Sequence, residues 1–183
     1  MPATRNLNRR QFLCFGVAPV VSVVPVKSAN PKVNKTRRVV TGIDTEGKSG
    51  IISDDGSSQV ANHFESDKFQ IRTLWLENSV PVNMTSNTET LDGYTFSFDP
   101  PKSGVIAIMV TCAPGFVGEH HRTQTIDFIF VISGAVELIM DKGKTTLYAG
   151  DTVIQRATFH TWRVVGNETC KFAAVLVGAE KLG

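Results

Sequence analysis

The sequence predicts an all-β fold, an antiparallel sandwich or barrel, and three observations support this prediction. Short runs rich in β-branched and aromatic residues recur at regular spacing through the C-terminal half of the chain. Turn signals such as Asp141–Lys144 separate these runs. Apolar residues do not follow the 3.6-residue period of a helix for more than two turns. Strands spaced in this way are typical of sandwiches and barrels.

The individual strands follow from the runs between the turns. In the N-terminal half, runs of β-forming residues predict strands over 39–43, 49–53 and 69–76. The segment 78–90 is rich in Asn, Ser, Thr and Pro, and we expect a loop that covers a cavity mouth, packs on a partner subunit or moves freely at the surface. Further strands are expected over 104–113, 125–133, 134–140, 145–149, 151–155, 158–165 and 170–177.

The composition is that of one ordinary globular domain. A chain of 183 residues, 42% hydrophobic and 20% charged, is long enough for a full core. The formal charge is +2, but residues 1–30 hold four basic residues and no acid, so the remainder has a charge of −2. This distribution does not indicate a nucleic-acid partner. No apolar run after residue 30 is long enough to span a bilayer.

Residues 1–29 are expected to be an export signal, 30–38 a linker and 39–183 the single domain. Arg9 and Arg10 precede the apolar run Phe12–Val26, which is too short to span a bilayer and follows the order of a secretory signal. The arginine pair resembles the bacterial twin-arginine signal. The alternatives are an ordinary secretory signal and an uncleaved membrane anchor. We therefore expect export to the bacterial periplasm, or tethering to a membrane.

Two cysteines remain outside the signal. Cys112 and Cys170 both fall in apolar, strand-like runs, where a thiol usually behaves as a small buried hydrophobe. We expect free thiols, although an oxidising compartment would permit a disulfide between them.

The candidate site lies in the run between Pro114 and Gly134. His121, Thr123 and Asp127 are spaced at even intervals there, and on one unbroken strand their side chains share a face. His160, in a later strand pattern, is the candidate second imidazole. Two imidazoles and a carboxylate that converge in a barrel mouth leave metal positions open for water, oxygen or substrate. The alternative is that each histidine is an ordinary core or surface residue.

These residues resemble the two motifs of the cupin superfamily. The run from Gly115 to Gly134 is similar to the first motif, and the run from Gly150 to His160 is similar to the second. The family pattern has a histidine in place of Thr123 and a glutamate in place of Asp127, and its last histidine comes one residue after His160. HRTQTIDFIFVISGAVEL and GDTVIQRATFHTW are also similar to a small single-domain cupin group.

The resemblance implies a double-stranded jelly-roll barrel, often a homodimer, with a metal or ligand site inside its mouth. It implies that His121, Asp127 and His160 hold a divalent metal ion, with Thr123 as a weak ligand or a nearby hydroxyl. Iron, manganese, nickel and zinc all suit such a set. His120 would replace a ligand only through a β-bulge, because it is out of phase on a regular strand.

A small-molecule ligand is the expected partner of this site. Met109, Ile129 and Trp162 are candidate apolar walls. Arg156 is the candidate substrate-binding cation, and Arg122 is a second one, although it has the wrong parity on the strand. The expected function is a metal-dependent enzyme of dioxygenase, decarboxylase or lyase type acting on a small oxygenated or carboxylated molecule. The alternatives are a non-catalytic binding module and a structural dimer module, and the fold does not decide between them.

Overall fold

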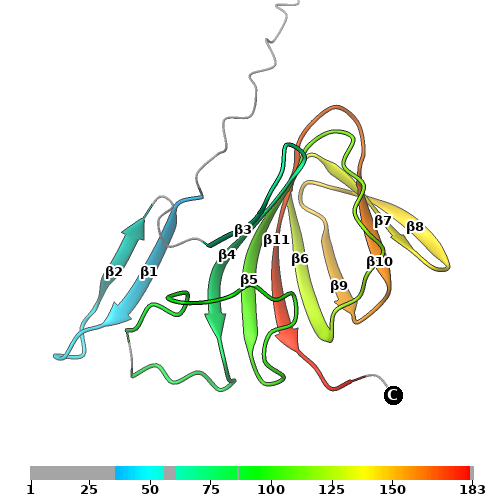
Figure 1. Cartoon of the computed structure of the whole chain (residues 1–183). Coiled ribbons are helices and arrows are strands. Elements are labelled where there is room, and N and C mark those ends of the chain that lie inside the picture. Colours follow the sequence, from blue (N-terminus) through cyan, green and yellow to red (C-terminus); the bar gives the residue numbers. More distant parts are fainter. Residues whose placement is uncertain (1–35, 56–60, 86, 182–183) are drawn as a thin grey trace, which may run out of the picture. The chain divides into compact units, whose positions relative to one another are not determined.

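The computed structural model describes residues 36–55, 61–85 and 87–181, and these form strands and loops only. The strands make a hairpin of β1 and β2, a six-stranded antiparallel sheet and a three-stranded antiparallel sheet (Figure 1). No helix long and apolar enough to cross a membrane occurs in these ranges. The strands are β1 (Arg38–Ile43), β2 (Ser49–Asp55), β3 (Ala61–Glu65), β4 (Phe69–Glu77), β5 (Val105–Cys112), β6 (Thr125–Ser133), β7 (Ala135–Met140), β8 (Gly143–Tyr148), β9 (Thr152–Arg156), β10 (His160–Val164) and β11 (Cys170–Gly178).

The all-β prediction is confirmed, and the expected strands agree with the observed ones within two residues at each end. β3 is the exception, because its sequence offers few β-forming residues. It forms at the edge of the six-stranded sheet by pairing with β4, with a register shift between Asn62 and Phe64. The expected export signal and most of the linker lie outside the described residues, and β1 begins at Arg38.

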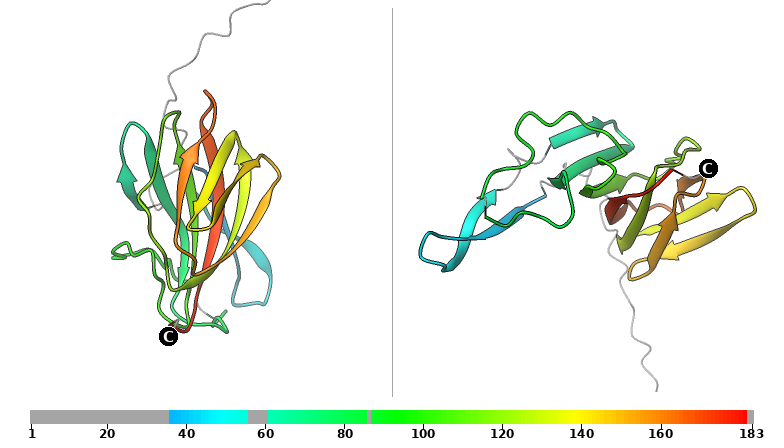
Figure 2. Two further views of the ribbon diagram at one scale, coloured as in Figure 1. Left: turned by 90° about the vertical axis from the view of Figure 1, so that its right-hand side faces the viewer. Right: turned by 90° about the horizontal axis from the view of Figure 1, so that it is seen from below.

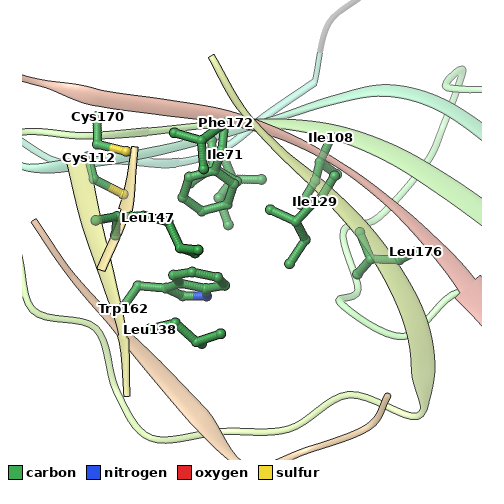
Figure 3. Close-up of a cluster of buried hydrophobic side chains, with 14 of the residues drawn as sticks. Ile71, Ile108, Cys112, Ile129, Leu138, Leu147, Trp162, Cys170, Phe172 and Leu176 are labelled. Atoms are coloured by element: carbon green, nitrogen blue, oxygen red, sulfur yellow. The ribbon is translucent and has the colours of Figure 1, made fainter. Parts of the chain in front are cut away.

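The core lies between the six-stranded sheet, in the order β3-β4-β5-β11-β6-β9, and the three-stranded sheet, in the order β10-β7-β8 (Figure 2). Trp162 and Leu138 of the smaller sheet face Phe172 and Ile71 of the larger one (Figure 3). The rings of Trp162 and Phe172 have centroids 5.2 Å apart. Each such buried side chain contributes about 1.5–3 kcal/mol of hydrophobic stabilisation, so this contact joins the two sheets.

The two cysteines of the domain are buried free thiols, as predicted. Cys112 on β5 and Cys170 on β11 lie directly opposite each other across the antiparallel pair. Burial raises the pKa of Cys170 to about 11 and raises the pKa of Cys112 still further. Both thiols therefore stay protonated at neutral pH.

The connection between β4 and β5 packs against the N-terminal strands. The guanidinium of Arg38 donates to both carboxylate oxygens of Glu89, at 3.1 and 2.5 Å, and to the carbonyl of Leu74 at 3.0 Å. Leu91 is buried in the core, and Asn87 donates to the carbonyl of Ile43 at 3.0 Å. Among the three expectations for this loop, a freely moving segment does not fit these contacts.

Candidate functional site

Two histidines from distant parts of the sequence lie side by side. His160 begins β10, and His121 lies in the connection that precedes β6. Their backbones form an isolated antiparallel bridge, in which each N–H donates to the other residue's carbonyl at 2.9 Å. The imidazole centroids are 4.3 Å apart. The structure thus brings together the two histidines that the sequence singled out.

The prediction of one unbroken strand through His121 and Asp127 is wrong, because β6 begins only at Thr125. The backbone of His121 pairs with His160, whereas the pairing of β6 with β9 begins at Ile126. Thr123, Thr125 and Asp127 nevertheless keep their common phase and are all buried. The hydroxyls of Thr123 and Thr125 lie 2.6 Å apart and share a hydrogen bond, so Thr123 already has a partner within the chain.

Both imidazoles are held in the same tautomer by main-chain carbonyls. Nδ1 of His121 lies 2.9 Å from the carbonyl of Glu119, and Nδ1 of His160 lies 3.0 Å from that of Thr158. A carbonyl oxygen only accepts, so each Nδ1 has the hydrogen and each Nε2 keeps a lone pair. Burial lowers the pKa of His160 to about 4, which keeps its ring neutral. Histidines that bind metals show this arrangement.

Asp127 and Gln155 form a buried polar pair next to His160. They lie opposite each other on β6 and β9, and both side chains are at least 95% buried. Nε2 of Gln155 donates to Oδ2 of Asp127 at 3.3 Å and lies 3.1 and 3.2 Å from the two ring nitrogens of His160. Oδ1 of Asp127 and Oε1 of Gln155 have no hydrogen-bond partner. Two unsatisfied acceptors in one buried pair are uncommon, and the described side chains supply no donor for either of them.

The carboxyl of Asp127 is tuned by its surroundings. Burial raises its pKa to about 6, and the nearby charge of Asp99 acts in the same direction, whereas the Thr125 hydroxyl and His121 lower it. At neutral pH the group is therefore ionised at a cost in stability, which a cation or a hydrogen-bond donor would offset.

The connection between β4 and β5 also reaches this site. The ring of Phe98 lies 5.9 Å from that of His121, and Oδ1 of Asp99 accepts from the main-chain N–H of Gln124 at 2.6 Å. Sequence reasoning did not place Phe98, Asp99 or Gln155 in the site. Gln155 stands inside the second cupin-like motif, which was its one sequence signal, while Phe98 and Asp99 had none.

The predicted substrate-binding residues separate into two groups. Trp162 and Ile129 are buried in the core, and the Trp162 ring lies edge-on to His160 with centroids 5.6 Å apart. The structure does not bring Met109 and Arg156 to the site. Met109 alternates with the buried residues of β5 and lies on its outer face, and Arg156 is exposed at the end of β9, because it follows the inward-facing Gln155.

The two remaining candidates lie at the surface. The guanidinium of Arg122 lies over the ring of Phe159 at 4.9 Å, and His120 contacts Asp141 at 3.3 Å. His120 therefore does not replace a site histidine.

The types of donor at this site fit a divalent metal ion. Two imidazole Nε2 atoms and the unsatisfied Oδ1 of Asp127 make a nitrogen and oxygen set that suits several transition metals. As the side chains stand in the part of the chain that the structure describes, however, no three His, Cys, Asp or Glu residues are gathered closely enough to hold an ion. The chemistry of the donors fits, and the closed set of three ligands is not formed.

Comparisons with known proteins agree with this fold and these motifs. A family model described as the cupin domain matches residues 108–177. The cupin-domain-containing oxidoreductase srdD of Neurospora crassa is 31% identical over 150 residues, which cover 76% of this chain and 72% of that protein. The cupin-domain-containing oxidoreductase fogC of Aspergillus ruber is 30% identical over 145 residues, covering 75% and 68%. A solved cupin 2 conserved barrel domain protein from Salinispora arenicola is 15% identical, covers 60% of this chain and 75% of that chain, and has a TM-score of 0.41.

These relatives correct one expectation. Location in the bacterial periplasm was inferred from an arginine pair that resembles a bacterial signal, but the curated relatives are fungal proteins, so this inference is wrong. The stretch on which it was based, residues 1–29, lies outside the described residues. The similarity to srdD and fogC extends over most of this chain and of both proteins. This chain belongs to the cupin family.

Proposed function

We propose that this cupin is a metal-dependent oxidoreductase acting on a small oxygenated or carboxylated molecule. The observation that supports it best is the pair of adjacent imidazoles, His121 and His160, whose Nδ1 atoms are held by carbonyls so that Nε2 is the nitrogen with the lone pair on each ring. The names of the relatives srdD and fogC, both cupin-domain-containing oxidoreductases, favour redox chemistry over decarboxylation or elimination.

His121, His160 and Asp127 would hold the ion, and iron, manganese, nickel and zinc all remain candidates. A bound divalent ion supplies Lewis-acid polarisation and the activation of water or oxygen. The chain's own side chains prepare the site for it. Gln155 holds one oxygen of Asp127, and the Trp162 ring packs edge-on against His160.

Metal content tests the proposal directly. Protein purified without an affinity tag should contain near-stoichiometric metal, and His121→Ala and His160→Ala should lose it. His120→Ala is the matched control, because His120 is adjacent in sequence but lies at the surface beside Asp141. Substoichiometric metal in the parent, unchanged in both site variants, would sink the proposal. Oxygen uptake over a panel of small phenols and keto acids then tests the redox branch.

A second function is favoured by one observation. Because the described side chains do not gather three metal-type groups, a non-catalytic small-molecule-binding module also fits the site. This alternative predicts that metal-free protein binds its ligand as tightly as protein supplied with metal, and that no product forms. Calorimetry with and without added metal, beside product analysis, separates the two functions.

We also propose that the protein is a homodimer. The outer face of β6 and β9 exposes four large apolar side chains, of which Phe128 and Ile154 are cross-strand neighbours and Phe130 is 45% exposed. A continuous apolar sheet face of this kind is typical of an interaction surface. Light scattering should give a dimer mass for the parent and for Tyr148→Glu, and a monomer mass for Phe130→Glu. A monomeric parent at all concentrations would contradict this.

A further inference from the structure

We propose that Gln155 and Asp127 together form a pair of hydrogen-bond acceptors that selects substrates by their hydroxyl groups. The proposal deepens the proposed function and depends on the ligand site lying beside His121 and His160. It starts from the two buried oxygens without partners, Oε1 of Gln155 and Oδ1 of Asp127. The two side chains face each other across β6 and β9 and are already joined through Nε2 and Oδ2 at 3.3 Å.

The orientation of the Gln155 amide follows from its neighbours. If the amide were turned over, its oxygen would face Oδ2 of Asp127, and two acceptors would meet without a hydrogen between them. With the amide nitrogen in that place, the nitrogen donates to the carboxylate, and Oε1 is left unsatisfied. The amide oxygen is therefore an acceptor that the described residues leave without a donor.

The same amide lies next to the ring of His160. Nε2 of Gln155 lies almost equally far from both ring nitrogens of His160, at 3.1 and 3.2 Å. An atom at equal distance from both nitrogens lies over the ring, out of line with either lone pair. The Nε2 atom of His160 is therefore not held by a linear hydrogen bond. A carboxylate oxygen has more than one lone pair, so Oδ1 of Asp127 can accept from a ligand and still serve as a proposed metal ligand in the same site.

The two acceptor oxygens indicate the chemistry of the ligand that would bind them. Both oxygens are hydrogen-bond acceptors without a donor, so the ligand must bring its own hydrogens. A carboxylate placed there would face two acceptor oxygens, and acceptors would meet with no hydrogen between them. The rings of Trp162 and Phe98 flank the two imidazoles. Two acceptors beside aromatic rings point to a neutral aromatic ligand with hydroxyl groups, which narrows the proposed substrate class to hydroxylated rather than carboxylated molecules.

A graded set of probes tests this inference. Catechol has two hydroxyl groups, guaiacol has one, and veratrole has the same ring with none, while benzoate represents the anionic class. We expect the parent to bind catechol about tenfold more tightly than guaiacol and guaiacol about tenfold more tightly than veratrole, with benzoate weakest, because each lost hydrogen bond leaves a buried acceptor unsatisfied. Calorimetry or ligand-observed NMR measures the four dissociation constants.

Two variants test whether Gln155 causes the preference for hydroxylated ligands. Gln155→Met keeps the length of the side chain and removes the acceptor, so the ratio of catechol to veratrole affinity should fall about tenfold. Arg156→Met is the matched control, because Arg156 is adjacent on β9 but exposed, and it should keep the parent ratio. If Gln155→Met does not fold, as judged by circular dichroism, Gln155→Asn withdraws the amide from the site and should show the same loss.

The outcomes separate this inference from the proposed function. Equal affinities for catechol and veratrole, preferred binding of benzoate, no binding of catechol at millimolar concentration, or an unchanged ratio in the Gln155 variant would overturn it. If the parent nevertheless binds metal and His121→Ala does not, the proposed function stands while the inference on hydroxyl selection is wrong. A hydroxyl preference in protein that binds no metal supports the inference and removes the metal-dependent reaction.

Discussion

Replacing Asp127 with asparagine should stabilise the metal-free protein at high pH and change it little at low pH. Burial raises the pKa of this carboxyl from 3.8 to about 6. Such a group favours the folded state below the unfolded pKa, and this contribution is lost as the pH rises through the folded pKa. Ionisation of Asp127 therefore costs about 3 kcal/mol at pH 8 and about 0.5 kcal/mol at pH 4. Asparagine has the same shape and does not ionise.

Urea unfolding of chelator-treated protein at pH 8 and pH 4, followed by tryptophan fluorescence, measures this difference. Asp127→Asn should raise the free energy of unfolding by about 3 kcal/mol at pH 8 and by less than about 1 kcal/mol at pH 4. Asp141→Asn, at an exposed carboxylate, is the control and should change it by about 0.5 kcal/mol or less. A destabilised variant at pH 8, or an equal effect at both pH values, would refute the reasoning. When metal is bound, the sign should reverse, because the variant has lost a proposed ligand.

Three further predictions concern other parts of the domain. Burial lowers the pKa of His160 from 6.5 to about 4. As the pH falls from 6.5 to 4, the metal-free parent should therefore lose about 3 kcal/mol more of its free energy of unfolding than His160→Gln. Equal losses in both proteins would contradict this prediction. Gly134 has φ +71°, and an added Cβ would lie 2.6 Å from the carbonyl oxygen of Thr169, so Gly134→Ala should lower the free energy of unfolding by about 1–3 kcal/mol in urea titrations. Because burial raises the pKa of Cys112 and Cys170, mass spectrometry should find neither thiol alkylated by iodoacetamide in native protein at pH 8 and both alkylated in urea.

The residues of the site come from three separate segments, and this explains why a single motif does not describe it. The first motif supplies His121 and Asp127, the second supplies Gln155 and His160, and the connection between β4 and β5 adds Phe98. The bridge between the two histidines replaces the expected continuous strand. A substitution in any of these segments is therefore expected to affect the others through shared contacts.

Local patterns determined much of the protein. Alternating β-forming residues and turn residues repeat along the chain, and both act over a few residues. The all-β class and the described strands other than β3 therefore followed from sequence. Even spacing placed Thr123 and Asp127 in one phase, and the structure buries both. The two motifs also singled out His121 and His160, which lie together.

Only the tertiary structure decided which face of an apolar strand points inward and which distant residues meet. Met109 lies in a nearly continuous apolar run, and such a run has no alternation of apolar and polar residues that would predict the inward face. Packing against the second sheet buried the neighbours of Met109 on β5 and left Met109 on the outer face. The register of β6 against β9 placed Gln155 opposite Asp127, and register depends on pairing between strands that no local pattern records. Phe98 reached His121 through a loop whose path depends on what it packs against. The sequence by itself determined the strands and the two histidines, whereas contacts between distant segments decided the acceptor pair and the surroundings that define the site.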